Sequence, residues 1–543
     1  MENGLLSVGE PMNEPLHDFA PGSPERSSLK EALKRMESEV VDIPMIIGGE
    51  AFRNGDTGKV TMPHRHGHVL ATYQKAGRED VERAVVRALE ARRLWENTSW
   101  TDRAAVMLKI AELICGKYRN TLLAATMAGQ SKNAYQAEID AVAESADFLR
   151  FNVRYASSIY SEQPKSGEAS LNRVEYRPLE GFVYAVTPFN FTAIASNLVL
   201  APALMGNVVL WKPATNSLLS SYYLMKIYEE AGLPAGVVNF LPGSGAVVSD
   251  VVLRDPALAG VHFTGSTEVF TTLWKGVAEN IRSYRSYPRL VGETGGKNFI
   301  VVHPSANVRA AVTAIVRGAF EYQGQKCSAV SRCYIPSSLR TPVLETLRET
   351  LSGMAMGSPD DFRNFVNAVI DESSFDNCMR YIERVKQSSE AEILFGGGGD
   401  KSSGYFVEPT VIETKNPRSL TMSEEIFGPV LTLYFYKDEE YEHMLTLCDE
   451  TSPYGLTGAV FATDREALRR ATTRLKYAAG NFYVNDKPTG AVVGKQPFGG
   501  SRASGTNDKA GSMLNLLRWT SPRTIKENLQ PPERYEYPFM KEA

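Results

Sequence analysis

The sequence has few of the features that mark disulfide-stapled, zinc-bound or membrane-embedded proteins. Its 543 residues include only five cysteines, and no two of them stand in C-x-x-C spacing. An odd and widely spaced set of this kind argues against a disulfide framework or a structural zinc site, so a reducing compartment is expected. No run approaches the ~18 consecutive apolar residues of a membrane span. We therefore expect no membrane-embedded segment.

A strong charge of one sign is also missing. The formal net charge is -4 with 22% charged residues, which gives no reason to expect nucleic acid or an acidic membrane surface as a partner. The first fifteen residues hold three glutamates and neither lysine nor arginine, unlike a secretory signal or an arginine-rich transit peptide. Hydrophobic residues reach 43%. That content allows a large core, and the length predicts roughly two to four lobes.

The order of the periodic segments predicts an α/β protein. Helices are expected over 78–97 and about 134–160, with a further helix capped by Thr101. From Phe182 onward, short β-rich runs alternate with helices, which indicates a parallel sheet covered on both faces. A second alternating series begins near Phe299. We therefore expect two α/β lobes with a boundary at 295–297.

Cys327 is the candidate nucleophile. It follows Gly-Gln-Lys in a polar turn, and a thiolate becomes a strong nucleophile when positive charge or backbone N–H groups lower its pKa. A structural cysteine is the commoner alternative for a lone Cys. Cys115 and Cys448 stand in apolar stretches and fit that alternative better.

Two further polar residues stand next to predicted strands. Glu293 ends an apolar run and precedes Thr-Gly-Gly, a position that suits a general base, although a solvated loop residue is the alternative. Asn190 lies between a strand and a helix, where its amide could donate to a developing oxyanion. A turn or N-cap asparagine is the alternative there.

The signals for phosphate and metal are weak. Gly265-Ser-Thr267 opens a helix after a strand, where free N–H groups bind phosphate, but no G-x-G-x-x-G is present. His64, His66 and His68 alternate along the chain. Without carboxylate or Cys ligands close in sequence, they favour a surface turn over a metal site. We predict no metal.

The order of these segments is more specific than any one of them. The Asn190 turn, a strand ending in Lys212, the Gly-Ser-Thr turn, Glu293-Thr-Gly-Gly-Lys and Gly-Gln-Lys-Cys327 are followed by Glu-Glu-Ile-Phe-Gly-Pro at 424–429 and Pro-Phe-Gly-Gly-Ser at 497–501. From about residue 40 to 525 the chain resembles the aldehyde dehydrogenase superfamily. The variants Thr-Pro-Phe-Asn-Phe-Thr-Ala and Phe-Glu-Tyr-Gln-Gly-Gln-Lys-Cys-Ser are similar to the branch that oxidises L-glutamate γ-semialdehyde to L-glutamate in proline breakdown.

The resemblance implies a division of labour. Cys327 would attack the aldehyde carbon, Asn190 and the backbone N–H of Cys327 would hold the oxyanion, and Glu293 would activate the water that hydrolyses a thioester. NAD would be the cofactor, although Thr215, where many NAD-preferring relatives carry Glu, leaves NADP open. The implied cofactor residues are Thr187, Lys212, Gly265, Ser266, Thr267, Glu425 and Phe427.

The resemblance also implies a pocket for the substrate. Ser328 and the backbone around Gly490 would hold the α-carboxylate and amine, and two aromatic rings would wall the aliphatic stem. Where some relatives carry Ser, this chain has Ala491, so backbone donors would have to suffice. The implied substrate residues are Glu144, Phe191, Ser328, Gly490, Ala491 and Phe498.

The family pattern further implies an arm over 1–29, a Rossmann-like NAD-binding lobe over 30–160 and 180–294, and a catalytic lobe over 295–505. The segments 161–179 and 506–543 would form an oligomerisation hairpin and tail, so a homodimer or higher homo-oligomer is expected. The mitochondrial matrix is expected from the family alone. Three alternatives stay open: oxidation of another small semialdehyde, acylation of CoA, and a non-catalytic binding protein on the same fold.

Overall fold

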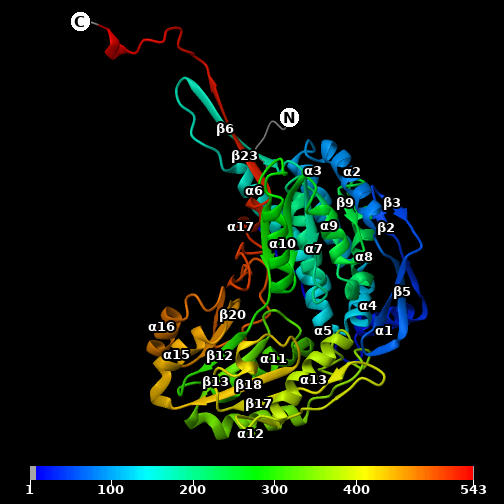
Figure 1. Cartoon of the computed structure of the whole chain (residues 1–543), viewed down its shortest axis with the longest axis vertical. Coiled ribbons are helices and arrows are strands. Elements are labelled where there is room, and N and C mark those ends of the chain that lie inside the picture. Colours follow the sequence, from blue (N-terminus) through cyan, green and yellow to red (C-terminus); the bar gives the residue numbers. More distant parts are fainter. Residues whose placement is uncertain (1–7, 542–543) are drawn as a thin grey trace.

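A computed structural model describes residues 8–541, and in it two α/β lobes stack with a long hairpin projecting from one end (Figure 1). The predicted fold class, with a Rossmann-like lobe and a second α/β lobe, is confirmed. The change from one lobe to the other falls between Glu293, which ends one sheet, and Asn298, which begins the next. Among the described residues, no helix is long and apolar enough to cross a membrane.

The first lobe is built on a seven-stranded sheet. Its strand order is β11-β10-β7-β8-β9-β2-β3, and β7 to β11 are parallel. The order reverses between β7 and β10, because the chain adds strands first on one side of β7 and then on the other. The strands are β2 Met45–Ile47, β3 Glu50–Phe52, β7 Phe182–Val186, β8 Val208–Lys212, β9 Val238–Phe240, β10 Leu258–Thr264 and β11 Arg289–Glu293.

Helices cover both faces of this sheet, which explains why its strands read as continuous hydrophobic runs. In β7, Val183 and Ala185 join one core cluster, whereas Phe182 and Tyr184 join the other. One face carries α2 Arg78–Trp95, α9 Gly245–Val252 and α10 Thr267–Glu279. The other carries α1 Pro24–Ser38, α3 Trp100–Cys115, α4 Arg119–Gln130, α6 Ser145–Ser161, α7 Thr192–Leu204 and α8 Leu218–Glu230.

The second lobe repeats the plan with the strand order β14-β17-β18-β13-β12-β20-β21, in which only the edge strand β14 is antiparallel. The strands are β12 Asn298–Val302, β13 Val330–Pro336, β14 Ala391–Phe395, β17 Thr410–Thr414, β18 Val430–Tyr436, β20 Thr457–Phe461 and β21 Asn481–Val484. Its helices are α11 Val308–Phe320, α12 Arg340–Ser352, α13 Glu372–Lys386, α14 Leu420–Ser423, α15 Tyr441–Glu450 and α16 Arg465–Arg474.

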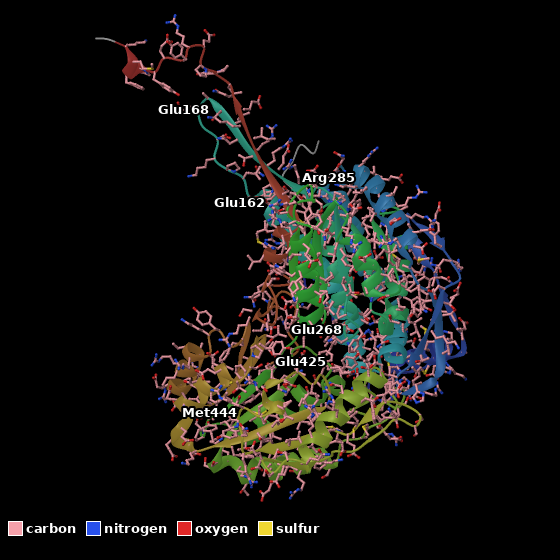
Figure 2. The ribbon with its side chains drawn as sticks, in the orientation of Figure 1. Glu162, Glu168, Glu268, Arg285, Glu425 and Met444 are labelled. Carbon is pink, nitrogen blue, oxygen red and sulfur yellow. The ribbon has the colours of Figure 1, made fainter. Side chains whose placement is uncertain are left out.

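Smaller elements complete the chain. A nine-residue antiparallel ladder joins β6 Ser170–Pro178 to β23 Thr520–Asn528. These two strands are far apart in the sequence, and together they form the projecting pair that is called the hairpin; Glu168 lies near its tip (Figures 1 and 2). The short helix α17 Met513–Leu517 precedes β23. The remaining strands are β1 Val41–Ile43, β4 Thr57–Met62, β5 Arg65–Gln74, β15 Gly399–Asp400, β16 Phe406–Val407, β19 Tyr454–Gly455 and β22 Ser501–Arg502.

Three local expectations change. The predicted N-cap at Thr101 is wrong, because Ser99 accepts the Asp102 amide at 3.1 Å and the helix starts at Trp100, whose ring stacks on Tyr160. Helix α1 begins at Pro24, inside the range 1–29 expected to form an arm separate from the lobes. The helix expected over 134–160 contains a π-helical segment, Glu138–Glu144, between α5 Ala134–Ala137 and α6.

The three histidines do not share a strand face. His64 lies in the turn before β5, where its Nδ1 meets the Ser131 hydroxyl at 3.3 Å, and burial lowers its pKa to about 4. His66 Nε2 lies 3.1 Å from the carbonyl oxygen of Lys401. No group of three His, Cys, Asp or Glu side chains that could hold a metal occurs between residues 8 and 541.

Candidate active site

One pocket at the junction of the lobes brings the predicted nucleophile and the predicted base together. Glu293 is the last residue of β11, and Cys327 lies in the segment that leads from α11 into β13. Both side chains line the same pocket, although they come from different lobes. The backbone approaches closely here, because a Cβ on Gly296 would collide with the Cys327 carbonyl oxygen. A larger residue at 296 would therefore displace the nucleophile.

The segment before Cys327 is held in an uncommon conformation. Tyr322 and Gln323 have φ angles of 50° and 55°, in the left-handed region that non-glycine residues rarely adopt. Buried contacts stabilise it: the Gln323 amide donates to the carbonyl oxygens of Ser131 at 3.1 Å and Ala368 at 2.8 Å. Strained backbone of this kind persists only where its surroundings over-determine it, which is common at active sites.

A second buried amide fixes the backbone at the nucleophile itself. Asn298 Nδ2 donates to the carbonyl oxygens of Cys327 at 2.7 Å and Ala329 at 2.9 Å. Both carbonyls are thereby turned toward β12. With its carbonyl held there, Cys327 has a defined backbone orientation before any ligand binds.

Asn190 contacts the same segment from the first lobe. It stands between β7 and α7, is 4% exposed, and donates from Nδ2 to the carbonyl oxygen of Gln325 at 3.1 Å. The Asn190 amide therefore contacts the backbone two residues before Cys327, in a setting from which water is largely excluded. A hydrogen-bond donor in such a setting stabilises developing negative charge far more than it does in water.

Burial sets the protonation states of the pocket. It raises the pKa of the Cys327 thiol far above its ordinary value, and the nearby carboxyls of Glu293 and Glu425 raise it further. Burial also raises the pKa of Glu293, while the Gly500 amide and the Lys509 ammonium oppose that rise. Without ligands the Cys327 thiol therefore favours its neutral form, so a charged nucleophile requires removal of that proton.

The six predicted substrate residues all line this pocket. Two aromatic walls and the glycine-containing turn surround a narrow cavity of about 90 Å³ next to Cys327. The Ser328 hydroxyl lies 2.7 Å from the Thr489 hydroxyl, which orients it toward the 489–491 turn. The residues brought together are Glu144, Phe191, Ser328, Gly490, Ala491 and Phe498.

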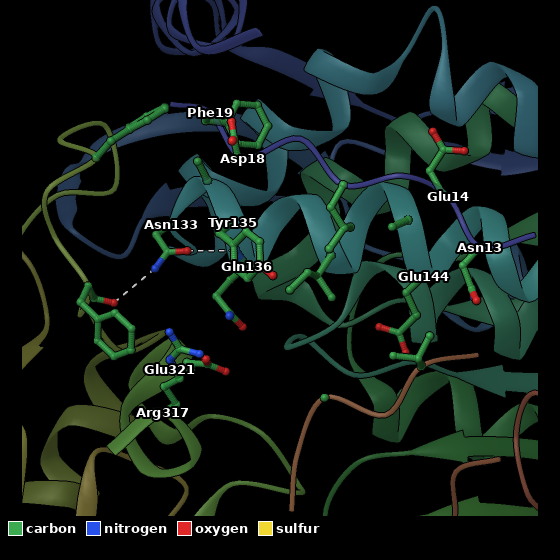
Figure 3. A pocket seen from close by; sticks show the side chains of 18 of the residues that line it. Asn13, Glu14, Asp18, Phe19, Asn133, Tyr135, Gln136, Glu144, Arg317 and Glu321 are labelled. Carbon is green, nitrogen blue, oxygen red and sulfur yellow. Dashed lines mark hydrogen bonds between the residues drawn. The ribbon is translucent and has the colours of Figure 1, made fainter. Parts of the chain in front are cut away.

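The narrow cavity opens into a vestibule of about 1000 Å³ (Figure 3). Glu144, Gly490 and Ala491 line both spaces, so the vestibule is continuous with the substrate pocket. The N-terminal arm forms one wall of it: Asn13 donates to Asp147 at 2.8 Å and Glu14 pairs with Arg119 at 3.0 Å. The arm therefore helps to shape the approach to Cys327.

Several pocket residues were not identified from the sequence. Lys326 and Lys487 both donate to Glu321 Oε2, at 3.1 and 3.0 Å, and all three side chains line the pocket. Lys326 stands inside the Gly-Gln-Lys-Cys segment and could have been noticed there. Lys487 and Thr489 carried no signal, because their proximity to Cys327 depends on how β21 and the following turn fold back.

The predicted cofactor residues gather at the carboxyl ends of the parallel strands. Thr187 follows β7, Lys212 ends β8, and Gly265-Ser-Thr267 follows β10. This edge, where the strand order reverses between β7 and β10, is where open α/β sheets bind their ligands. Ser266 is exposed and caps α10 by accepting the Val269 amide at 3.3 Å, so the free N–H groups of a 13-residue helix face solvent beside it.

Lys212 suits a polar, uncharged or anionic ligand. Burial alone lowers the pKa of its ammonium to about 8, and no carboxylate offsets that burial. An amine in this state has donors to offer to ribose or phosphate oxygens. Thr187 is turned inward instead: its hydroxyl accepts from Trp211 Nε1 at 2.9 Å, so it supports the edge of the sheet.

Glu425 and Phe427 approach this edge from the second lobe. Glu425 lies where the lobes meet and accepts the Gly296 amide at 2.8 Å, while the neighbouring Gly295 amide donates to Thr267 at the start of α10 at 3.4 Å. Burial raises its pKa to about 7. Phe427 has a φ of 59° and packs edge-on against Phe189, with ring centroids 5.9 Å apart. Glu425 thus lies within electrostatic reach of Cys327, and Phe427 contacts the residue that precedes Asn190.

Comparison with known proteins agrees with this arrangement. Residues 52–525 match the model of the aldehyde dehydrogenase family. The chain belongs to that family. Its relatives in the family include the mitochondrial delta-1-pyrroline-5-carboxylate dehydrogenase of Dictyostelium discoideum, which is 53% identical and aligns over 98% of this chain and 96% of the relative. The human mitochondrial enzyme of the same name is 48% identical over 97% of this chain and 94% of the relative.

Solved structures of family members agree with this assignment. The delta-pyrroline-5-carboxylate dehydrogenase of Mycobacterium tuberculosis bound with NAD superimposes with a TM-score of 0.96 at 50% identity, covering 99% of this chain and all of that one. The Thermus 1-pyrroline-5-carboxylate dehydrogenase with bound NAD gives a TM-score of 0.91 at 33% identity, covering 96% and 100%. This aldehyde dehydrogenase therefore shares its whole architecture with enzymes that bind NAD.

Proposed function

We propose that this aldehyde dehydrogenase oxidises L-glutamate γ-semialdehyde, the open form of pyrroline-5-carboxylate, to L-glutamate with NAD. The observation that carries the proposal is a single pocket lined by a cysteine, a glutamate and a hydroxyl-bearing turn. Relatives at about half identity over nearly the whole chain bear the name of that activity. The geometry adds a reason why the substrate would be small, slender and polar at its far end.

Cys327 forms the first bond of the reaction. Its sulfur attacks the aldehyde carbon after the thiol has lost its proton to solvent. The aldehyde oxygen gains negative charge, which the Asn190 amide and the backbone N–H of Cys327 would stabilise. Bound NAD supplies the acceptor for the hydride, so an acyl group is left on sulfur.

Glu293 completes the cycle. Its carboxylate takes a proton from water, and the resulting hydroxide adds to the thioester carbon. The C–S bond then breaks, which releases the acid, and the proton held by Glu293 passes to the sulfur, which restores the thiol and the carboxylate. Burial raises the pKa of Glu293, which makes its carboxylate a stronger base than an exposed one. A carboxylate in this position favours water over CoA as the acyl acceptor.

The far end of the pocket suits an amino acid head group. Ser328, held by Thr489, and the turn at Gly490 present a hydroxyl and backbone N–H groups to a carboxylate. Phe191 and Phe498 leave room for an unbranched stem between that turn and Cys327. The residues that would hold NAD are Lys212, Gly265, Ser266, Thr267, Glu425 and Phe427, with Thr187 in support.

The names of the relatives bear on the cellular location of the enzyme, and the projecting hairpin bears on its oligomeric state. The mitochondrial names of several relatives support a mitochondrial matrix location. The β6–β23 hairpin extends away from both lobes with long free edges (Figure 1). Edges of this length are usually covered, so we propose a homodimer or larger homo-oligomer in which a second copy covers the hairpin.

A substrate panel tests the proposal. Steady-state oxidation of pyrroline-5-carboxylate, succinic semialdehyde and propanal with NAD and with NADP should favour pyrroline-5-carboxylate with NAD, and Cys327→Ser should abolish it. The buried Cys333→Ser variant is the matched control and should retain activity. Preference for another aldehyde would reject the substrate, and dependence of product formation on CoA would reject hydrolysis.

A further inference from the structure

A buried ion pair behind the pocket takes no part in the chemistry described so far. Lys132 Nζ and Asp140 Oδ2 lie 2.6 Å apart, and each side chain is 1% exposed. Burying two charges is costly even when they pair, and stability alone seldom explains such a pair. The contacts that Lys132 and Asp140 make with neighbouring segments indicate a further role for the pair.

Asp140 holds the start of helix α7. Its two carboxylate oxygens accept the backbone amides of Thr192 at 3.0 Å and Ala193 at 2.9 Å. The N-cap residue of α7, Phe191, offers no side-chain cap of its own. The carboxylate from the π-helical segment therefore substitutes for a local cap and fixes the turn that carries Asn190.

Lys132 connects that turn to the nucleophile segment. Its ammonium stands 4.2 Å from the centroid of the Phe191 ring and 4.5 Å from that of Tyr322. Phe191 follows Asn190 directly, and Tyr322 is one of the two left-handed residues before Cys327. The residue preceding Lys132, Ser131, accepts the Gln323 amide at 3.1 Å. The segment 131–132 thus contacts both the turn that carries Asn190 and the segment that leads to Cys327.

We propose that Lys132 is a positioning residue for catalysis, which with Asp140 sets the register between the Asn190 amide and Cys327. A desolvated cation between two aromatic faces attracts both rings and so draws their backbones toward fixed positions. The inference rests on the proposed function only in the role of Asn190. It concerns how the oxyanion donor is placed, whatever aldehyde is bound.

The test measures acylation of Cys327 directly. With p-nitrophenyl acetate, the sulfur bonds to the acetyl carbon and p-nitrophenolate leaves, so the burst rate reports the nucleophile and its oxyanion donor without NAD or the semialdehyde. We expect Lys132→Met to slow the burst at least ten-fold in the wild-type background. In an Asn190→Ala background, the same substitution should slow it less than two-fold, because the donor that it positions is gone.

Controls separate positioning from folding. Arg103 is another buried cation that contacts α7, but at the opposite end, where it donates to Leu204 O at 2.9 Å. Arg103→Met should lower the melting temperature and leave the burst rate per folded enzyme unchanged. If Lys132→Met does not fold, the Lys132→Met/Asp140→Asn double variant, which leaves no unpaired charge, carries the same comparison.

Two results would overturn the inference. One is an equal burst reduction in both backgrounds, and the other is a lowered melting temperature with a wild-type burst rate. Steady-state kinetics add a further readout: kcat for the semialdehyde should fall while its KM changes less than three-fold. A wild-type enzyme inactive on the semialdehyde would reject the proposed function, and the burst comparison would still decide the role of Lys132.

Discussion

The Asn190 side-chain amide donates to the Gln325 carbonyl oxygen at 3.1 Å, which ties the turn after β7 to the backbone two residues before Cys327. This contact joins the two lobes at the point where bonds are made. It also means that the donor and the nucleophile are placed before substrate binds. Preorganised donors of this kind account for a large part of enzymatic rate enhancement.

Removing the Asn190 donor should therefore lower kcat more than it weakens substrate binding. Asn190→Ala is expected to lower kcat by ~10²–10³-fold with a small change in KM, because the interaction strengthens only as negative charge develops. Steady-state kinetics measure both constants. Asn207 is the matched control, since it is buried in the same lobe and donates to the carbonyls of Pro202 and Trp519. Asn207→Ala should lose stability while kcat per folded enzyme holds; equal kcat losses in both variants would contradict the oxyanion role.

The pH dependence should follow Glu293. Its active form is the carboxylate and its pKa is raised by burial, so hydrolysis should accelerate as pH rises through that raised value. Lys509 lowers the pKa of Glu293, and Lys509→Met removes that positive charge. We expect the rising limb of the kcat–pH profile to move to higher pH, because the carboxylate loses a stabilising positive charge.

Lys476→Met, which removes a surface lysine beside Tyr477, is the control for this shift. Its profile should overlie that of the wild type. A limb that stays in place in Lys509→Met, or moves to lower pH, would show that another group governs the rate.

Substrate selectivity should depend on Ser328. Ser328→Ala removes the hydroxyl that pairs with Thr489, and a carboxylate that loses one buried partner is bound about ten-fold more weakly. KM for the semialdehyde should rise by about that factor, while KM for propanal, which has no carboxylate, stays the same. Ser331→Ala is the control, because the Ser331 hydroxyl has no hydrogen-bond partner among residues 8–541. A similar rise for both aldehydes would point to general damage to the pocket.

Cofactor affinity should depend on Lys212. Lys212→Met keeps the length of the stem and removes the donor, so the NAD dissociation constant should rise about ten-fold with little change in KM for the aldehyde. Quenching of intrinsic fluorescence on titration with NAD measures this constant. Lys226→Met, which removes a partly exposed lysine paired with Glu229, should bind NAD normally. Unchanged affinity in Lys212→Met would place the dinucleotide elsewhere.

Much of this architecture follows from local sequence. Phe182–Val186 and the run 208–211 are apolar on both faces, and that pattern alone predicts buried parallel strands. The helix boundaries were less predictable. Ser99 and Thr101 are both good caps, and the stacking of Trp100 on Tyr160, which lies far away in sequence, decides between them.

The candidate site was likewise only partly predictable from the sequence. Glu293 ends β11 and Asn190 follows β7, so their meeting at the carboxyl edge of one sheet is a consequence of parallel topology. Cys327 precedes β13 of the other sheet, and its place opposite them depends on how the two lobes stack. Lys487 and Lys132 have no such marker. Lys487 reaches Glu321 only because the chain folds back after β21, and Lys132 reaches Tyr322 only across the lobe boundary. Contacts between distant segments leave no periodic trace in the sequence.

Trapping the acyl-enzyme tests the central claim that Cys327 and Glu293 act in one pocket. Glu293→Gln keeps the shape of the side chain and removes the base, so incubation with pyrroline-5-carboxylate and NAD should give one equivalent of NADH per site and a γ-glutamyl group on Cys327, read by peptide mass spectrometry. Continuous turnover in Glu293→Gln, or a full NADH burst with Cys327 unmodified, would contradict the account.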